Sequence, residues 1–127
     1  MRLLLDTHIA IWAVTGHAKM PAHAKSLILA ADEVFVSAAS IWEISIKHGL
    51  KPDKLSMSGE QALNEFTAAG FSLLAISPVH AATLDNLAPH HRDPFDRMLI
   101  AQALSEPLRL ITHDSNLQIY SELVQLV

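Results

Sequence analysis

The chain has 127 residues, half of them apolar, and it carries 9 basic against 13 acidic side chains, a formal net charge of -4. This length is typical of one domain, so we expect residues 1–127 to form a single domain with a sizeable core. The acidic balance argues against a broad basic surface for nucleic acid. The absence of cysteine excludes disulfides and thiolate metal sites, and it fits a reducing, cytoplasmic environment.

No apolar run in the sequence approaches the roughly 18 residues that cross a bilayer, so we expect no membrane span. In the opening MRLLLDTHIAIWAV, Asp6 and His8 interrupt the apolar stretch that a signal peptide requires to be continuous. The high apolar content indicates either a surface covered by a partner, including a second copy, or a core rich in Ala, Leu and Ile.

Short apolar runs alternate with helix-like segments along the chain. The candidate strands are residues 2–6, 33–37, 71–76, 108–112 and, less clearly, 123–127. These runs are nearly continuous, a pattern typical of strands buried on both faces. The candidate helices are residues 7–14, 21–31, 38–48, 59–69, 79–87 and 94–105. This alternation predicts an α/β fold with a mostly parallel sheet, and the irregular stretch 49–59 is expected to be a surface loop.

Acidic side chains occur at or near the ends of several candidate strands. The strand 2–6 ends on Asp6, and Asp114 follows the strand 108–112. The strand 33–37 ends on Ser37 and leads into a helix that carries Glu43 among apolar neighbours such as Trp42. Ligands of an open parallel sheet bind beyond the carboxyl ends of its strands, where the strand order reverses. We therefore expect these three acids at one edge of the sheet.

Two further aspartates stand at the start of the helix expected at 94–105. Asp93 followed by Pro94 fits an N-cap with proline at the first helical position. Asp96 shares the apolar stripe of Leu99, Ile100 and Ala103, close to the helix start. Because that end of the helix lies near the carboxyl edge of a parallel sheet, we expect Asp96 to join the other acids and Asp93 to act only as a cap.

Each of these acids alone has a structural explanation as a helix cap or a capping-box partner. Four carboxylates at one edge, however, would repel one another, and some would protonate unless a cation neutralised them. Oxygen ligands suit Mg²⁺ or Mn²⁺, and such ions commonly support hydrolysis of phosphate esters. We therefore expect a divalent metal site made of Asp6, Glu43, Asp96 and Asp114.

Four blocks of the sequence, in this order and spacing, resemble the PIN-domain family and within it the VapC-type toxins of bacterial toxin–antitoxin modules: LLLDTHIAIWA, VSAASIWEISIKHGL, HRDPFDRMLIAQAL and LITHDSNL. The resemblance implies a three-layer fold, with a five-stranded parallel sheet flanked by helices. It also implies a metal-dependent endoribonuclease that acts on structured RNA, such as tRNA or rRNA. Because the sequence has no arranged His pair for attack by the RNA 2′-hydroxyl, we expect a metal-activated water to attack phosphorus and leave 5′-phosphate and 3′-hydroxyl ends. The family's acidic quartet falls on Asp6, Glu43, Asp96 and Asp114.

Other polar residues are expected to support this site. Thr112, in a T-x-D element, would hold a carboxylate or a water, and Thr7 and Ser37 would line the site. Three basic residues are in reach of substrate phosphates: Lys47, Arg92 and Arg97. Solvated surface charges, or a helix ion pair such as Asp93 with Arg97, are the alternatives.

The resemblance further implies an antitoxin whose tail occupies an apolar groove and brings a basic side chain to the acids, within an assembly built on toxin homodimers. The groove is expected between the helix of Ile9 and Trp12 and the helix of Ile41 and Trp42, unless the tryptophans belong to the core.

Three other classes remain possible from the residues. Eight histidines, with Asp6-x-His8 and His113-Asp114 among them, leave room for a His/Asp metal-dependent phosphoesterase, although neither HExxH nor His-x-His occurs. A receiver domain would need an acceptor aspartate where this chain has Ser77. A non-catalytic metal-binding interaction domain is the third.

Overall fold

Five parallel strands form one sheet in the computed structural model, which describes residues 1–55 and 57–127. The strands are β1 (Arg2–Leu5), β2 (Glu33–Ser37), β3 (Ser72–Leu74), β4 (Arg109–Thr112) and β5 (Val124–Leu126). Their order is β3-β2-β1-β4-β5, and each neighbouring pair is parallel. The chain first adds β2 and β3 on one side of β1 and then adds β4 and β5 on the other side. The strand order therefore reverses between β1 and β4.

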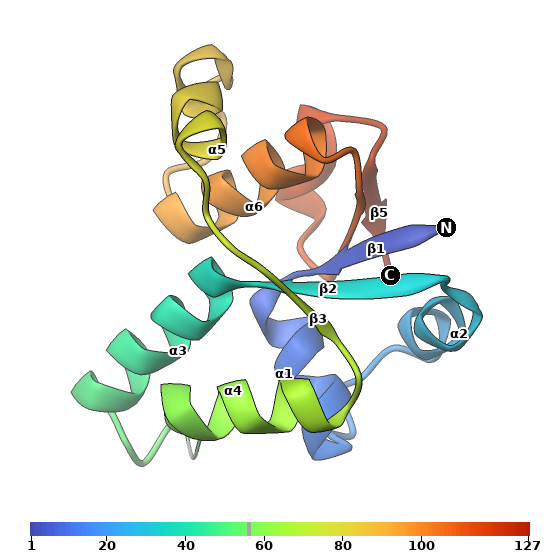
Figure 1. Ribbon diagram of the computed structural model, residues 1–127, viewed down its shortest axis with the longest axis vertical. Helices are drawn as coiled ribbons and strands as arrows, with labels where there is room; N and C mark the ends of the chain where they lie inside the picture. Colours follow the sequence, from blue (N-terminus) through green and yellow to red (C-terminus); the bar gives the residue numbers. More distant parts are fainter. Residues whose placement is uncertain (56) are drawn as a thin grey trace.

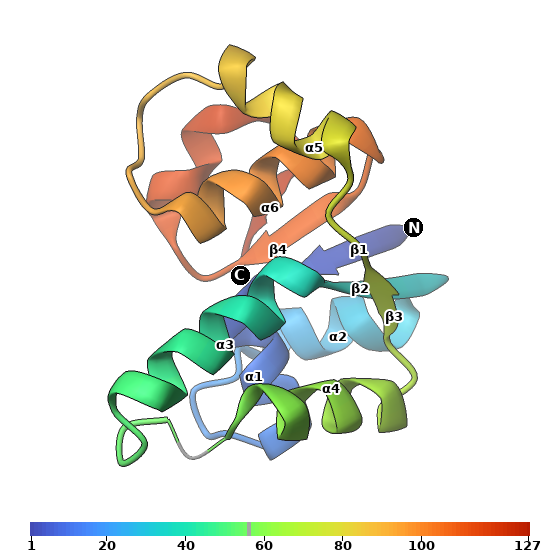
Figure 2. The ribbon, with the colours of Figure 1, turned by 60° about the vertical axis from the view of Figure 1, so that its left-hand side comes forward.

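Helices cover both faces of this sheet (Figures 1 and 2). They are α1 (Thr7–Thr15), α2 (Ala22–Ala30), α3 (Ala38–Leu50), α4 (Gly59–Ala68), α5 (Pro78–Thr83) and α6 (Pro94–Ser105), with the 3-10 helices η1 (Leu84–Asn86) and η2 (Ser115–Tyr120). In both views α1, α2 and α4 lie below the sheet and α5 and α6 above it. The three-layer α/β fold with a five-stranded parallel sheet is therefore confirmed.

Alternate residues of β1 supply the two halves of the core. Leu3 and Leu5 pack into a cluster with Ile9 of α1 and Phe66 of α4, on one face of the sheet. Leu4 points to the other face, into a cluster formed largely by α6, β4 and η2. All three leucines of β1 are fully buried, which is the result expected for a continuous apolar strand covered by helices on both sides.

The main differences from the sequence expectations lie at the ends of elements. α3 continues to Leu50, two residues into the loop expected at 49–59, and Ser56 of that loop lies outside the described residues. The helix expected at 79–87 ends as α5 at Thr83 and continues as the 3-10 turn η1. β3 ends at Leu74, and the next carbonyl, Ala75, accepts a hydrogen bond from Gln102 of α6 (3.3 Å) instead of from a strand. In the described part of the chain, no helix combines the length and apolarity that crossing a membrane requires.

Candidate metal centre

A cavity of about 120 Å³ lies beyond the carboxyl ends of β1 and β4, where the strand order reverses. It is lined by Asp6, Thr7, His8, Glu43, Lys47, Asp93, Asp96 and Asp114. The four acids expected to form a metal site thus meet in one cavity, although they come from four different elements. Asp93 joins them, so its carboxylate contributes charge to the site as well as capping a helix.

Asp6 is a buried acid of this cavity, only 7% exposed. Its Oδ1 accepts a hydrogen bond from the main-chain N–H of Ile9 (2.9 Å), which makes it the N-cap of α1. Its Oδ2 accepts a hydrogen bond from the Thr112 hydroxyl (2.5 Å). Burial raises the pKa of this carboxyl above its ordinary value, and the hydrogen bonds from Thr112 and Ile9 oppose that rise.

Thr112 connects the acids at the ends of β1 and β4. Its hydroxyl oxygen accepts a hydrogen bond from the main-chain N–H of Asp114 (3.0 Å), which leaves the hydroxyl proton for Asp6. Asp114 then caps η2 by accepting the N–H of Asn116 (2.9 Å). The T-x-D element therefore uses its threonine to hold a carboxylate, one of the two roles expected from the sequence.

Glu43 stands about two turns into α3 and is only 4% exposed. Lys47, one turn further along the same helix, forms an ion pair with it. The Lys47 side chain is half exposed, whereas that of Glu43 is buried, and both line the cavity. Lys47 thus neutralises one of the carboxylates of the cavity.

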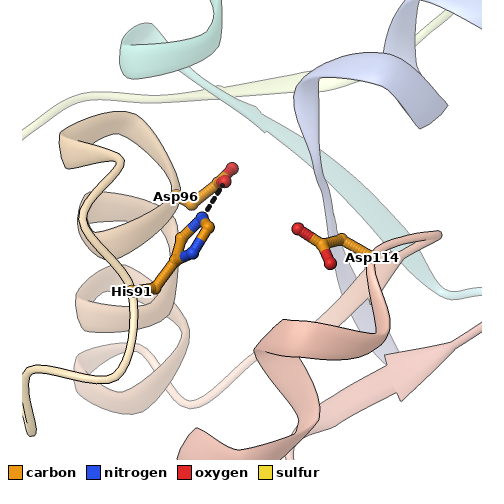
Figure 3. A group of neighbouring side chains, drawn as sticks. All are labelled: His91, Asp96 and Asp114. Carbon is orange, nitrogen blue, oxygen red and sulfur yellow. Dashed lines mark hydrogen bonds and ion pairs between the residues drawn. The ribbon is translucent and has the colours of Figure 1, made fainter.

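Asp93 caps α6 as expected, but it also lines the cavity, so the expectation that it acts only as a cap is corrected. Oδ1 of Asp93 accepts the N–H groups of Phe95 (2.9 Å) and Asp96 (3.1 Å), so Asp93 is the N-cap. Asp96 turns into the cavity, where its Oδ2 lies 2.8 Å from Nε2 of His91 (Figure 3). Burial raises the pKa of Asp96 to about 6, helped by the charges of Asp93 and Glu43 and opposed by His91.

Of the two residues expected to line the site, Thr7 does so and Ser37 does not. Thr7 lines the cavity and donates a hydrogen bond to the Ser40 hydroxyl (2.9 Å). Ser37 is fully buried and caps α3 by accepting the N–H of Ala39 (3.0 Å). Ser37 therefore supports the helix that carries Glu43 and does not line the cavity.

Arg97, expected to contact substrate, instead fastens the segment that precedes α6. Its guanidinium donates hydrogen bonds to the main-chain carbonyls of Leu87 (3.3 Å), Ala88 (3.0 Å) and His91 (3.3 Å), and to the Tyr120 hydroxyl (3.4 Å). The alternative ion pair with Asp93 does not form among the described residues, where these contacts occupy the guanidinium. Arg92 is exposed on the same segment.

Histidines contribute in a way that the sequence did not predict. His91 reaches Asp96, and His8 lines the cavity beside Asp6. Nδ1 of His113 lies 3.0 Å from the Val127 carbonyl oxygen, and His113 lines a neighbouring cavity together with Asp6, His8 and Asp114. The sequence contains no pattern in the loop before Asp93 that distinguishes His91 from the other seven histidines.

The donor set of this cavity fits a hard divalent cation. Five carboxylates meet in a volume of about 120 Å³, room for a few water molecules at ~30 Å³ each. Lys47 is paired with one of them, and the raised pKa values of Asp6 and Asp96 show that burial works against their ionisation. One ligand atom each from His91, Asp96 and Asp114 can be chosen so that all lie within 4.8 Å of one another. A divalent ion would satisfy this excess of negative charge.

Comparison with known proteins agrees with the fold. The family model described as "PIN domain" matches residues 3–123, so the chain belongs to the PIN-domain family. It is 30% identical over 117 residues to "Ribonuclease VapC22" of Mycobacterium tuberculosis, which covers 91% of this chain and 89% of that relative.

Solved structures with a similar fold include toxin–antitoxin complexes. VapBC2 from Rickettsia felis bound to a promoter DNA fragment has a TM-score of 0.69 at 17% identity and covers 100% of this chain and 98% of that one. Mycobacterium tuberculosis VapC20, described as a "Sarcin-Ricin loop cleaving toxin", has a TM-score of 0.58 at 16% identity, over 94% and 97% of the two chains. These likenesses concern the fold.

The raised pKa of Asp96 predicts that Asp96→Asn stabilises the metal-free protein. The folded-state pKa of about 6 exceeds the ordinary value of 3.8, so the cost of keeping Asp96 ionised in the folded protein grows between these two pH values and is complete above pH 6. One pKa unit corresponds to about 1.4 kcal/mol, so we expect a gain of about 1–3 kcal/mol at pH 7.5 in EDTA. Thermal unfolding should show this gain shrink towards pH 5, where folded wild-type protein takes up the proton. A variant that is no more stable than wild type at pH 7.5 would contradict the electrostatic account.

Proposed function

We propose that this protein is a divalent-metal-dependent endoribonuclease and the toxin of a VapBC-type pair, with residues 1–127 acting as one domain in the cytoplasm. The observation that carries the proposal is the meeting of Asp6, Glu43, Asp96 and Asp114 in one small cavity. Membership of the PIN-domain family and 30% identity to a ribonuclease support it. The description of VapC20 as a cleaver of the sarcin–ricin loop supports a structured RNA substrate.

The four acids would hold Mg²⁺ or Mn²⁺. The chemistry that such an ion supplies is polarisation of a phosphoryl oxygen and activation of a water for in-line attack on phosphorus, which leaves 5′-phosphate and 3′-hydroxyl ends. Thr112 keeps Asp6 in place through its hydroxyl, and Ile9 does so through its N–H. Because these bonds exist before substrate arrives, the carboxylate need not reorganise during the reaction.

Basic residues next to the cavity would bind the RNA backbone. A second cavity of about 380 Å³ is lined by His8, Lys47, Leu50, Lys51, Lys54 and Leu55. His8 and Lys47 line both cavities, so the lysines continue directly from the acids. Lys47 stays a proposed phosphate contact, joined by Lys51 and Lys54, and Arg92 remains an exposed candidate. Arg97 is no longer proposed as a phosphate contact, because its guanidinium is hydrogen-bonded to the loop before α6.

Cleavage assays on Asp96 and Asp93 variants test this proposal. Asp96→Asn should reduce metal-dependent RNA cleavage by about 100-fold or more, because it removes a proposed ligand of the ion. Asp93→Asn should cost less than about 10-fold, because asparagine caps a helix about as well as aspartate. The assay uses total RNA with Mg²⁺ or Mn²⁺, and EDTA should stop cleavage. Equal activity of well-folded Asp96→Asn and wild-type protein would overturn the assignment.

The apolar surface supplies a face for an antitoxin. Trp42 (57% exposed), Ile46 (40%) and Leu50 (77%) stand at four-residue spacing on α3 and form an exposed stripe. Trp42 packs edge-on against Phe95 of α6, with ring centres 5.1 Å apart. Ile9 is fully buried, so the groove wall expected from it belongs to the core instead. We propose that an apolar antitoxin segment covers this stripe and that a basic side chain beside it reaches the acids. The toxin would act as a homodimer within this complex.

Co-purification tests the partner. The protein is co-expressed with the product of any small reading frame adjacent to its gene, and we expect a stable complex in which cleavage is blocked. Ile46→Glu should weaken that complex by at least about 10-fold, because it places a charge in a buried apolar contact. Val79→Glu, at a 66% exposed position on α5, is the matched control and should leave binding unchanged. A neighbouring product that neither binds nor inhibits would contradict the toxin assignment.

A further inference from the structure

His91 lies close enough to Asp96 and Asp114 to share an ion with them, since one ligand atom from each of the three residues can be chosen so that all lie within 4.8 Å of one another. Figure 3 shows its ring beside Asp96, with Asp114 facing the pair. Nε2 of His91 lies 2.8 Å from Oδ2 of Asp96. Adjacent ligands of an octahedral ion at 2.0–2.1 Å stand about 3 Å apart. The nitrogen and the oxygen therefore already have nearly the spacing of two neighbouring ligands.

The loop that carries His91 is held in place by the helix that carries Asp96. Arg97, the residue after Asp96, donates hydrogen bonds to the carbonyl of His91 itself and to those of Leu87 and Ala88. The neighbouring His90 ring packs edge-on against Tyr120, with centres 5.4 Å apart, and the Tyr120 hydroxyl also receives a hydrogen bond from Arg97. Because these contacts fix both sides of the site to α6, the imidazole and the carboxylate keep their relative positions without an ion.

We propose that His91 is a ligand of the divalent ion through Nε2, so that the site contains one imidazole nitrogen among its carboxylate oxygens. This proposal rests on the proposed metal-dependent function and concerns the same site. An imidazole ligand favours transition-metal ions, whereas Mg²⁺ prefers oxygen ligands and retains its waters. His91 therefore gives the site a preference for Mn²⁺ over Mg²⁺ that carboxylates alone would not supply.

A merely positioning role for His91 makes a different prediction. In that case Nε2–H would only orient Asp96 by donating a hydrogen bond, and no nitrogen would contact the ion. His91→Gln, whose side-chain amide is a hydrogen-bond donor, could then replace it with little loss. If His91 is a ligand, glutamine does not restore the nitrogen contact.

Electron spin-echo measurements on Mn²⁺-loaded full-length protein distinguish these roles, because ¹⁴N coupling to Mn²⁺ reports a bound nitrogen directly. We expect this coupling in the wild type and in His90→Gln, the matched control, and its loss in His91→Gln. We also expect His91→Gln to weaken Mn²⁺ binding in calorimetry by roughly 10-fold or more, and Mg²⁺ binding by less than about 3-fold.

Two outcomes would overturn the proposal while leaving the nuclease site intact: Mn²⁺ bound to the wild type without ¹⁴N coupling, or coupling that persists in folded His91→Gln. The first would mean that His91 only orients Asp96, and the second that another histidine, such as His8, binds the ion. Failure of the proposed function looks different, since Mn²⁺ would then fail to bind the wild type, or would bind Asp96→Asn equally well. That result would overturn this proposal too.

Discussion

The burial of several carboxylates together in one cavity is the constraint on which the rest of this site depends. Asp6, Glu43, Asp93, Asp96 and Asp114 line one small cavity, and burial raises the pKa of both Asp6 and Asp96. A fold gains no stability from such a cluster. The cluster is sustained by other contacts in the fold: the fully buried leucines of the central strand β1, three carboxylates that also cap helices, and one lysine that pairs with Glu43. A divalent ion turns this unfavourable arrangement into a binding site, which is why the cluster indicates a function.

The same residues combine structural and chemical roles, and this economy explains how so short a chain builds the site. Asp6 begins α1 with one oxygen and receives Thr112 with the other. Thr112 in turn fixes Asp114, so the ends of the two central strands are joined by one hydroxyl group. Arg97 has a similar role in the loop before α6, where its guanidinium donates hydrogen bonds to three main-chain carbonyls. Loss of either residue would therefore disturb the geometry of the acids before it disturbed the core.

The parts of this arrangement that were predictable from sequence depend on regular elements. Parallel strands end at one edge, so Asp6 and Asp114 could be placed together, and helix periodicity separated Asp96 from the capping Asp93. Loop geometry has no such periodicity. His91 lies in such a loop, so its contact with Asp96 could not be predicted from the sequence. The carbonyl partners of Arg97 are also set only by tertiary folding, so the sequence left a substrate contact as the simplest interpretation of this residue. Ser37 was misplaced for a similar reason: a serine at a strand end suits a cap and a site wall equally well. Ile9 was placed in a groove wall, although its position on α1 buries it against β1.

The central claim is that the acids at the reversal of the strand order bind one divalent ion between them. Anomalous diffraction from crystals soaked in Mn²⁺ tests this claim most directly, because it locates manganese without assumptions about activity. The account predicts a strong anomalous peak inside the cavity, about 2.0–2.3 Å from oxygen atoms of at least two of Asp6, Glu43, Asp96 and Asp114. An intact cavity with no peak at millimolar Mn²⁺, or a peak only at surface carboxylates such as Asp53 or Asp85, would contradict it.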